Sequence, residues 1–174
     1  MRVTCNVDEV TKQLEALAID VEKRMINMVH QFSYGVASSA VDYTPLGDSV
    51  KYAPLYQMRQ QVWGLKPVEG YARGSWQVSL DGSLDKQELY GPSSGEVALG
   101  AVDTHLRNYR LGEDILIGNP AHYIGLLEGL TGVPSSKQAP QGIMKPATEK
   151  IMGFYALKLD DYYNQNKTWS GGWQ

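Results

Sequence analysis

The sequence has a single cysteine, Cys5, among its 174 residues. An intrachain disulfide therefore cannot form, and a zinc site built from several cysteines is excluded. The first residues lack the continuous apolar stretch of a signal peptide. No run approaches the roughly 18 apolar residues of a membrane span. We therefore expect a soluble protein that is made in a cytoplasm and has no membrane partner.

An excess of positive charge is also missing, since the formal net charge is −3 and the isoelectric point is about 5.6. Such a surface has no general attraction for nucleic acid or anionic lipid. Hydrophobic residues make up 43% of the chain and charged residues 20%, which is enough apolar material for an ordinary core. We expect a single domain over residues 1–163, followed by a flexible polar segment, 164–174, that carries two tryptophans.

Several common catalytic motifs are absent. The sequence has no HExxH, CxxC, GxGxxG or phosphate-binding loop. His30 has Tyr34, and not a metal-binding side chain, four residues further on. We therefore expect no enzyme, and no catalytic residue, metal or cofactor. One alternative stays open: a small hydrolase or lyase in which His122 and Glu128 form an acid–base pair.

What the sequence does have is one very long amphipathic segment. Asp8 suits an N-cap, and Thr44 followed by Pro45 suits the end of a helix, so we predict a helix over 9–42. It would be about 50 Å long, far more than an average helix. Such a helix can pack in the core, or outreach its own domain and touch a neighbour. Its apolar residues recur in steps of three and four: Val10, Leu14, Leu17, Val21, Met25, Met28, Phe32 and Val36.

The rest of the chain alternates strand and helix patterns between loops. Residues 45–72 look irregular, and 74–83 alternate as a strand that turns at Asp81-Gly82. Residues 96–109 allow a helix or a strand, whereas 113–118 resemble a buried strand. Pro146 suits the first turn of a last helix, with one apolar face formed by Ile151, Tyr155, Leu159 and Tyr162.

These elements predict an α+β fold. We expect the long N-terminal helix and the C-terminal helix to pack on a small β-sheet, mostly antiparallel or mixed, with long loops. Loops of this length are uncommon unless they have a function.

Residues 121–151 read AHYIGLLEGLTGVPSSKQAPQGIMKPATEKI. A tyrosine, an apolar residue and Glu-x-Gly are followed by a loop, a Gln-Ala-Pro-x-Gly segment and the last helix. This arrangement resembles the head–tail joining and tail-completion proteins of tailed bacteriophages. The positions that match are Tyr123, Leu127, Glu128, Gly129, Ser136, Lys137, Gln138, Ala139, Pro140, Gly142, Ile143, Met144, Pro146 and Ala147.

Two further stretches fit the same family. The long helix ends in an Ala-x-x-x-Thr-Pro-like pattern, here Ala40 to Pro45. A Gly-x-Ala-x-x-Ser-Trp-like entry into a strand follows, here Gly70 to Trp76. The resemblance therefore touches most of residues 8–163 and is densest at 121–151.

The resemblance implies a structural protein of the virion neck, assembled in the cytoplasm of a bacterial host. It would form a ring of six copies, or of twelve, that completes the top of the tail and joins it to the head connector. Its partners would be other neck proteins and the tail-tube or terminator protein. DNA would pass through the lumen without specific binding, which suits a negative net charge. The alternatives are a tail terminator that caps tail-tube polymerisation and an adaptor for a host factor.

Glu128 has two possible roles, a contact with a neighbouring protein or a local cap on a backbone. The loop 130–142, the loop 45–72, the long helix and the tail are candidate contact surfaces, because long loops and exposed tryptophans are common at interfaces. The candidate interaction residues are Tyr123, Glu128, Gly129, Lys137, Gln138, Pro140, Trp169 and Trp173.

Overall fold

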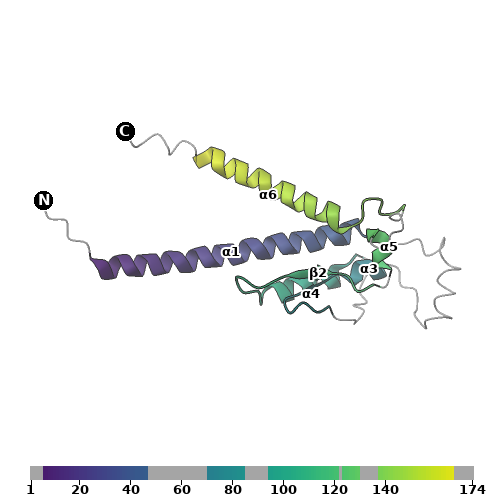
Figure 1. Cartoon of the computed structure of the whole chain (residues 1–174), viewed down its shortest axis with the longest axis horizontal. Helices are drawn as coiled ribbons and strands as arrows, with labels where there is room; N and C mark the ends of the chain where they lie inside the picture. Colours follow the sequence, from purple (N-terminus) through teal and green to yellow (C-terminus); the bar gives the residue numbers. More distant parts are fainter. Residues whose placement is uncertain (1–5, 47–69, 85–93, 122, 130–136, 167–174) are drawn as a thin grey trace.

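The computed structural model describes residues 6–46, 70–84, 94–121, 123–129 and 137–166, with side chains described as far as residue 158 (Figure 1). The fold is α+β, with a long N-terminal helix, a C-terminal helix and a small antiparallel sheet, which confirms the predicted class. The elements are α1 (Val7–Tyr43), α3 (Tyr71–Gly74), β1 (Gln77–Ser79), α4 (Glu96–Leu106), β2 (Leu116–Gly118), α5 (Ile124–Glu128) and α6 (Met144–Asn166).

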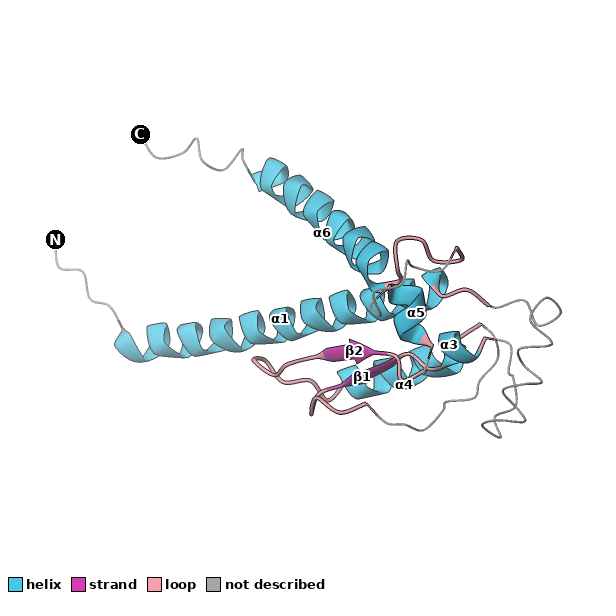
Figure 2. Ribbon diagram, turned by 45° about the vertical axis from the view of Figure 1, so that its right-hand side comes forward, coloured by secondary structure: helices cyan, strands magenta, loops and turns pink. Residues whose placement is uncertain are grey.

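The long helix α1 organises the molecule. Helix α6 runs antiparallel to it, meets its C-terminal end and diverges from it towards the two chain termini (Figures 1 and 2). Ile151 of α6 lies against Gly35 of α1, and the rings of Phe32 and Tyr155 are 5.6 Å apart between centroids. The sheet and α4 pack on a different side of the same end of α1. The first half of α1 thus extends beyond the packed region.

The ends of α1 follow from its local chemistry. The helix begins two residues earlier than predicted, with Asn6 at the N-cap, so the prediction of Asp8 as N-cap was wrong. The first helical hydrogen bond runs from the N–H of Val10 to the carbonyl of Asn6, which leaves Asp8 inside the first turn. A carboxylate is favourable there because the first turn carries partial positive charge. The predicted end is confirmed, since Thr44 is the C-cap.

The sheet is smaller than the sequence predicts. The two strands pair antiparallel, with Val78 opposite Ile117. The predicted strand 74–83 is wrong at its start, because 71–74 form the short helix α3. The strand predicted at 113–118 is confirmed over 116–118, as β2, but its predicted burial is wrong, since Leu116 is 39% exposed. Ile115 and Ile117 pack with Val78 on the face of the sheet that meets α1 and α4.

Two apolar clusters hold the described elements together. The smaller one lies between α1, α4 and the sheet and contains Ala37, Val78, Val102 and Leu106. The larger one connects the end of α1 with Trp76, α5 and the start of α6. Its buried members are Ala40, Val41, Trp76, Leu127, Ala139, Ile143 and Ala147.

Candidate functional site

Glu128 joins α5 to α6. Its carboxylate accepts hydrogen bonds from the backbone N–H groups of Ile143 and Met144, each over 3.0 Å. Helix α6 begins at Met144, so these N–H groups are among those that a helix start leaves without an internal partner. A carboxylate there gains charge-assisted hydrogen bonds and a favourable interaction with the helix dipole. Of the two roles considered for Glu128, the local cap is the one observed.

Two glycines complete this junction. Gly129 ends α5 with a φ of 71°, and Gly142 has a φ of 76°, a conformation that L side chains rarely adopt. A Cβ atom at Gly142 would lie 2.7 Å from Oε2 of Glu128. Gly142 therefore needs both the backbone freedom and the small size of glycine, which lets the loop close against the carboxylate.

The other predicted interaction residues lie around this junction or outside the described part of the chain. Lys137, Gln138 and Pro140 are exposed, whereas Ala139 between them is buried in the larger cluster. The Tyr123 ring is half-buried, with its centroid 5.9 Å from that of Tyr71. Residues 137–140 therefore form an exposed rim anchored by one buried alanine. Most of the predicted 130–142 loop, together with His122, Trp169 and Trp173, lies outside the described residues.

A second junction ties the end of α1 to the stretch before β1. The Thr44 hydroxyl donates to the Ala40 carbonyl over 2.6 Å and accepts a hydrogen bond from Nε1 of Trp76 over 2.8 Å. Nε of Arg73 donates to the Thr44 carbonyl over 2.6 Å. Asn119 extends the network, because its Nδ2 donates to the carbonyl of Ala72. Sequence reasoning missed Arg73 and Asn119, whose partners lie 29 and 47 residues away.

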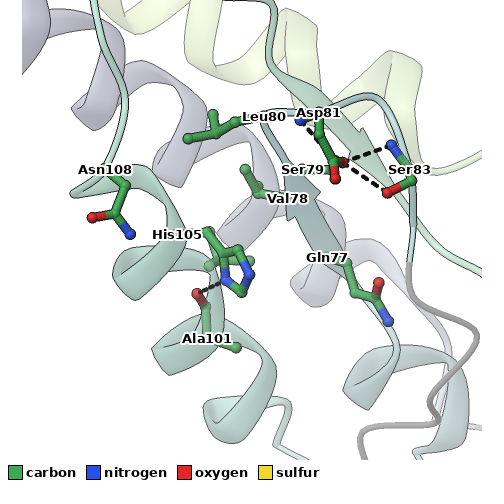
Figure 3. A pocket seen from close by; sticks show the side chains of 10 residues that line it. Gln77, Val78, Ser79, Leu80, Asp81, Ser83, Ala101, His105 and Asn108 are labelled. Atoms are coloured by element: carbon green, nitrogen blue, oxygen red, sulfur yellow. Dashed lines mark hydrogen bonds between the residues drawn. The ribbon is translucent and has the colours of Figure 1, made fainter.

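A groove of about 360 Å³ lies between β1, the turn after it and α4 (Figure 3). His105 and Asn108 line its helical side, and Nδ1 of His105 is 2.9 Å from the Ala101 carbonyl oxygen of its own helix. Asp81 lies on the opposite side, where its carboxylate points towards Ser83. This groove has no signal in the sequence beyond the Asp81-Gly82 turn.

Hydrogen bonds to the Asp81 carboxylate make it strongly acidic. The Ser79 hydroxyl donates over 2.6 Å, and the backbone N–H and hydroxyl of Ser83 donate over 2.9 and 2.7 Å. The Ser79 bond, followed by those from Ser83, lowers the pKa of Asp81 to about 2. A carboxylate of such low pKa is a weak base at neutral pH, so its observed work is to hold the turn.

The buried side of α1 meets an acidic partner on α4. Nε2 of His30 lies 3.3 Å from Oδ1 of Asp103, without the alignment of a hydrogen bond. Arg107 donates from Nε and Nη2 to the other oxygen of Asp103, over 3.0 and 2.7 Å.

Within the described residues, no three His, Cys, Asp or Glu side chains gather in a way that could hold a metal ion. The same part of the chain contains no helix long and apolar enough to cross a membrane.

The polar residues at both junctions are therefore engaged in hydrogen bonds that connect secondary-structure elements. Glu128 links α5 to α6, and Thr44 links α1 to Trp76. Both junctions border the larger apolar cluster, so their polar groups and its packing support the same part of the fold. A scan against protein-family models found no matching family, and searches of curated proteins and of solved structures found no match.

Proposed function

We propose that this chain is a structural protein of the neck of a tailed-phage virion. It forms a closed ring of six or twelve copies that completes the top of the tail and joins it to the head connector. Each copy contacts the next through two different surfaces, because a closed cyclic ring is built from heterologous contacts. Its place is the virion, and its partners are the neighbouring neck and tail proteins.

One observation carries this proposal. Three separate stretches, 40–45, 70–76 and 121–147, carry the resemblance to the neck proteins, and all three contribute to one packed cluster with its two polar junctions. Residues of the pattern that are far apart in the sequence therefore pack together in one cluster. This supports the view that the resemblance concerns the fold and the assembly of the protein.

The use of Glu128 favours a structural role over the hydrolase or lyase alternative. An acid–base carboxylate needs an oxygen that reaches the reacting group. Both oxygens of Glu128 instead lie 3.0 Å from backbone N–H groups at the start of α6. The exposed surfaces of the described residues include the first half of α1, the outer surface of α6 and the rim at 137–140, which are available for contacts between proteins.

The decisive test is cryo-electron microscopy of intact particles from a phage that encodes this chain. We expect a ring of this protein between the portal vertex and the tail. Deleting its gene should leave filled heads and finished tails that fail to join, or joined particles that lose DNA. A chain that is absent from purified particles, with normal particles in the deletion strain, would contradict the proposal.

A tail terminator gives a different result in the same deletion strain. Without a terminator, tail tubes grow beyond their normal length, whereas a joining protein leaves tail length unchanged. The enzyme alternative is tested by the substitutions His122→Ala and Glu128→Ala, which should abolish an activity while the variants stay folded. Tail length and particle joining therefore separate the proposal from its alternatives.

A further inference from the structure

The first half of α1 has an apolar face that no described residue covers. Six side chains on it are between 41% and 71% exposed. We call this set the α1 stripe; it consists of Val7, Val10, Leu14, Leu17, Val21 and Met25. From Val7 to Val21 the steps are three, four, three and four residues, the spacing of a helix seam that packs against another helix. Exposed apolar surface of this extent marks an interaction site.

The stripe continues an interface that the structure already contains. At 3.6 residues per turn, the same face of α1 leads through Met28 to Phe32 and Gly35. These last two residues contact Tyr155 and Ile151 of α6. The face that binds a helix at one end of α1 is therefore open at the other end, which indicates a helix as its occupant.

Helix α6 of the same chain cannot cover the whole stripe. Tyr155 pairs with Phe32, and α6 ends at Asn166, so an α6 laid flat along α1 would reach only the level of Val21. This follows because two antiparallel α-helices advance by the same rise per residue. Val7 to Leu17 would remain uncovered in any position of α6. No described helix of this chain covers these residues, which favours a helix from another molecule as their partner.

Helix α6 offers a complementary surface. Phe154, Leu157 and Lys158 share one face at helical spacing, and we call this set the α6 outer face. Phe154 is 50% and Leu157 68% exposed, and Nζ of Lys158 lies 4.6 Å from the centre of the Phe154 ring. Residues 144–158 contain three lysines and one glutamate, whereas Asp160 and Asp161 follow on the same helix and make α6 neutral as a whole. By contrast, residues 7–25 contain five acidic and three basic side chains. The two surfaces thus match in apolarity, and residues 144–158 of α6 are opposite in net charge to residues 7–25.

We propose that the α1 stripe of one copy packs against the α6 outer face of a second copy of this chain. The contact joins two different surfaces, so it repeats from copy to copy and can close a ring. This inference rests on the proposed ring and names the subunit contact within it. Each subunit inserts its long helix beside the C-terminal helix of its neighbour.

The first test is the size of the purified full chain, measured by sedimentation over a range of concentrations. The double substitution Leu14→Glu with Leu17→Glu places charge in the contact and should raise the dissociation constant of the oligomer at least about 30-fold. The matched control is Ile19→Glu, because Ile19 is 53% exposed on the same helix but lies away from the stripe. Helicity by circular dichroism should stay unchanged in all variants, since the replaced side chains are exposed.

The second test identifies the partner surface. In a Cys5→Ser background, chains with Leu17→Cys are mixed with chains with Leu157→Cys and treated with a short bismaleimide linker. Cross-linked dimers should form in the mixture and not in either sample alone. Dimers in the Leu17→Cys sample alone would mean that α1 pairs with α1, which overturns the inference.

The remaining outcomes separate this inference from the proposed function. An oligomer that persists in the Leu14→Glu, Leu17→Glu variant overturns the subunit contact but leaves the neck ring standing. A wild-type chain that stays monomeric and uncross-linked also overturns the contact, and the particle experiment then decides the function independently. If deletion of residues 167–174 exposes the stripe to binding of an apolar dye that the full chain excludes, the occupant is the chain's own tail and the inference fails.

Discussion

Nε1 of Trp76 donates a hydrogen bond over 2.8 Å to the hydroxyl of Thr44, and both residues are buried. The two lie 32 residues apart, with Thr44 at the end of α1 and Trp76 just before β1. The same hydroxyl donates to the Ala40 carbonyl, so one small side chain ends the helix and satisfies the indole. A buried indole that packs well needs such a partner for its N–H.

Replacing Thr44 with valine keeps the shape of the side chain but removes the hydroxyl. The buried indole N–H of Trp76 then loses its partner, and we expect a loss of about 1–3 kcal/mol in the free energy of unfolding. The control is Thr104→Val, because the Thr104 hydroxyl makes the same type of bond to the carbonyl four residues earlier but is exposed. Urea denaturation should show a change below about 0.5 kcal/mol for the control. Equal losses in the two variants would contradict the role of the Thr44–Trp76 bond.

Glu128→Gln tests the cap on α6. Glutamine keeps one acceptor oxygen but loses the charge and the second acceptor, so we expect a destabilisation of about 0.5–2 kcal/mol. Glu149→Gln removes a carboxylate from an exposed position of the same helix and should change stability by less than about 0.5 kcal/mol. Amide hydrogen exchange provides a local measure, because the N–H groups of Ile143 and Met144 should exchange faster in the Glu128 variant only.

Gly142→Ala and Gly112→Ala form a matched pair, since both glycines have a positive φ. Each substitution places a side chain in the left-handed region, at a cost of about 1–2 kcal/mol. Only at Gly142 would the new Cβ also meet the Glu128 carboxylate, whereas nothing lies within 4 Å at Gly112. We expect the free energy of unfolding of the Gly142 variant to be lower than that of the Gly112 variant by about 1 kcal/mol. Thermal denaturation of the two variants decides, and equal melting temperatures would contradict the close fit.

The lowered pKa of Asp81 predicts that its contribution to the stability of the fold depends on pH. Its pKa in the folded protein is about 2, below the ordinary value of 3.8, so its hydrogen bonds favour the folded state above about pH 4. This contribution is lost as the pH falls from about 4 to 2, because the folded carboxylate becomes protonated. Carbon-detected NMR of the Asp81 carboxyl should show a midpoint near 2, and Ser79→Ala should raise that midpoint towards 3.8. A midpoint near 3.8 in the wild-type protein would contradict the role of Ser79.

The extent of α1 could be predicted from the sequence because its signals are local. Steps of three and four continue without a break, and Thr44-Pro45 ends the pattern. Which part of the helix would be buried could not be predicted, since the same periodicity continues through both halves. Burial depends on where α4, α6 and the sheet meet α1, and these contacts join residues distant in the sequence.

The hydrophobic pattern of residues 96–109 could not distinguish a helix from a strand, and the structure shows why. Val97 and Leu99 suggested that a strand was also possible, but Val97 is 44% exposed. The buried residues of α4 are Ala98, Val102 and Leu106, each four positions after the last. An alanine carries little weight in a hydrophobic pattern, although Ala98 is fully buried. The helical spacing of the buried residues becomes visible only when Ala98 is counted as a core residue.

The candidate site was partly predictable for the same reason. Glu-x-Gly indicated the end of a short element, and Gly129 indeed ends α5 with a positive φ. The partners of Glu128 could not be predicted, because the N–H groups that it caps lie 15 and 16 residues later. The turn at Asp81 was visible, but its lowered pKa and the groove beside it depend on how β1 lies against α4.

Gly35 stands at the vertex of the two diverging helices, where a Cβ atom would lie 3.1 Å from Cδ1 of Ile151. The part of α1 from Val7 to Gly35 is about 42 Å long. A swing of roughly 5° about the vertex would move the far tip by about 4 Å, given the rise of 1.5 Å per residue. A larger side chain at Gly35 would press on Ile151, so the small size of this residue affects where the far tip of α1 can reach a neighbouring subunit in the proposed ring.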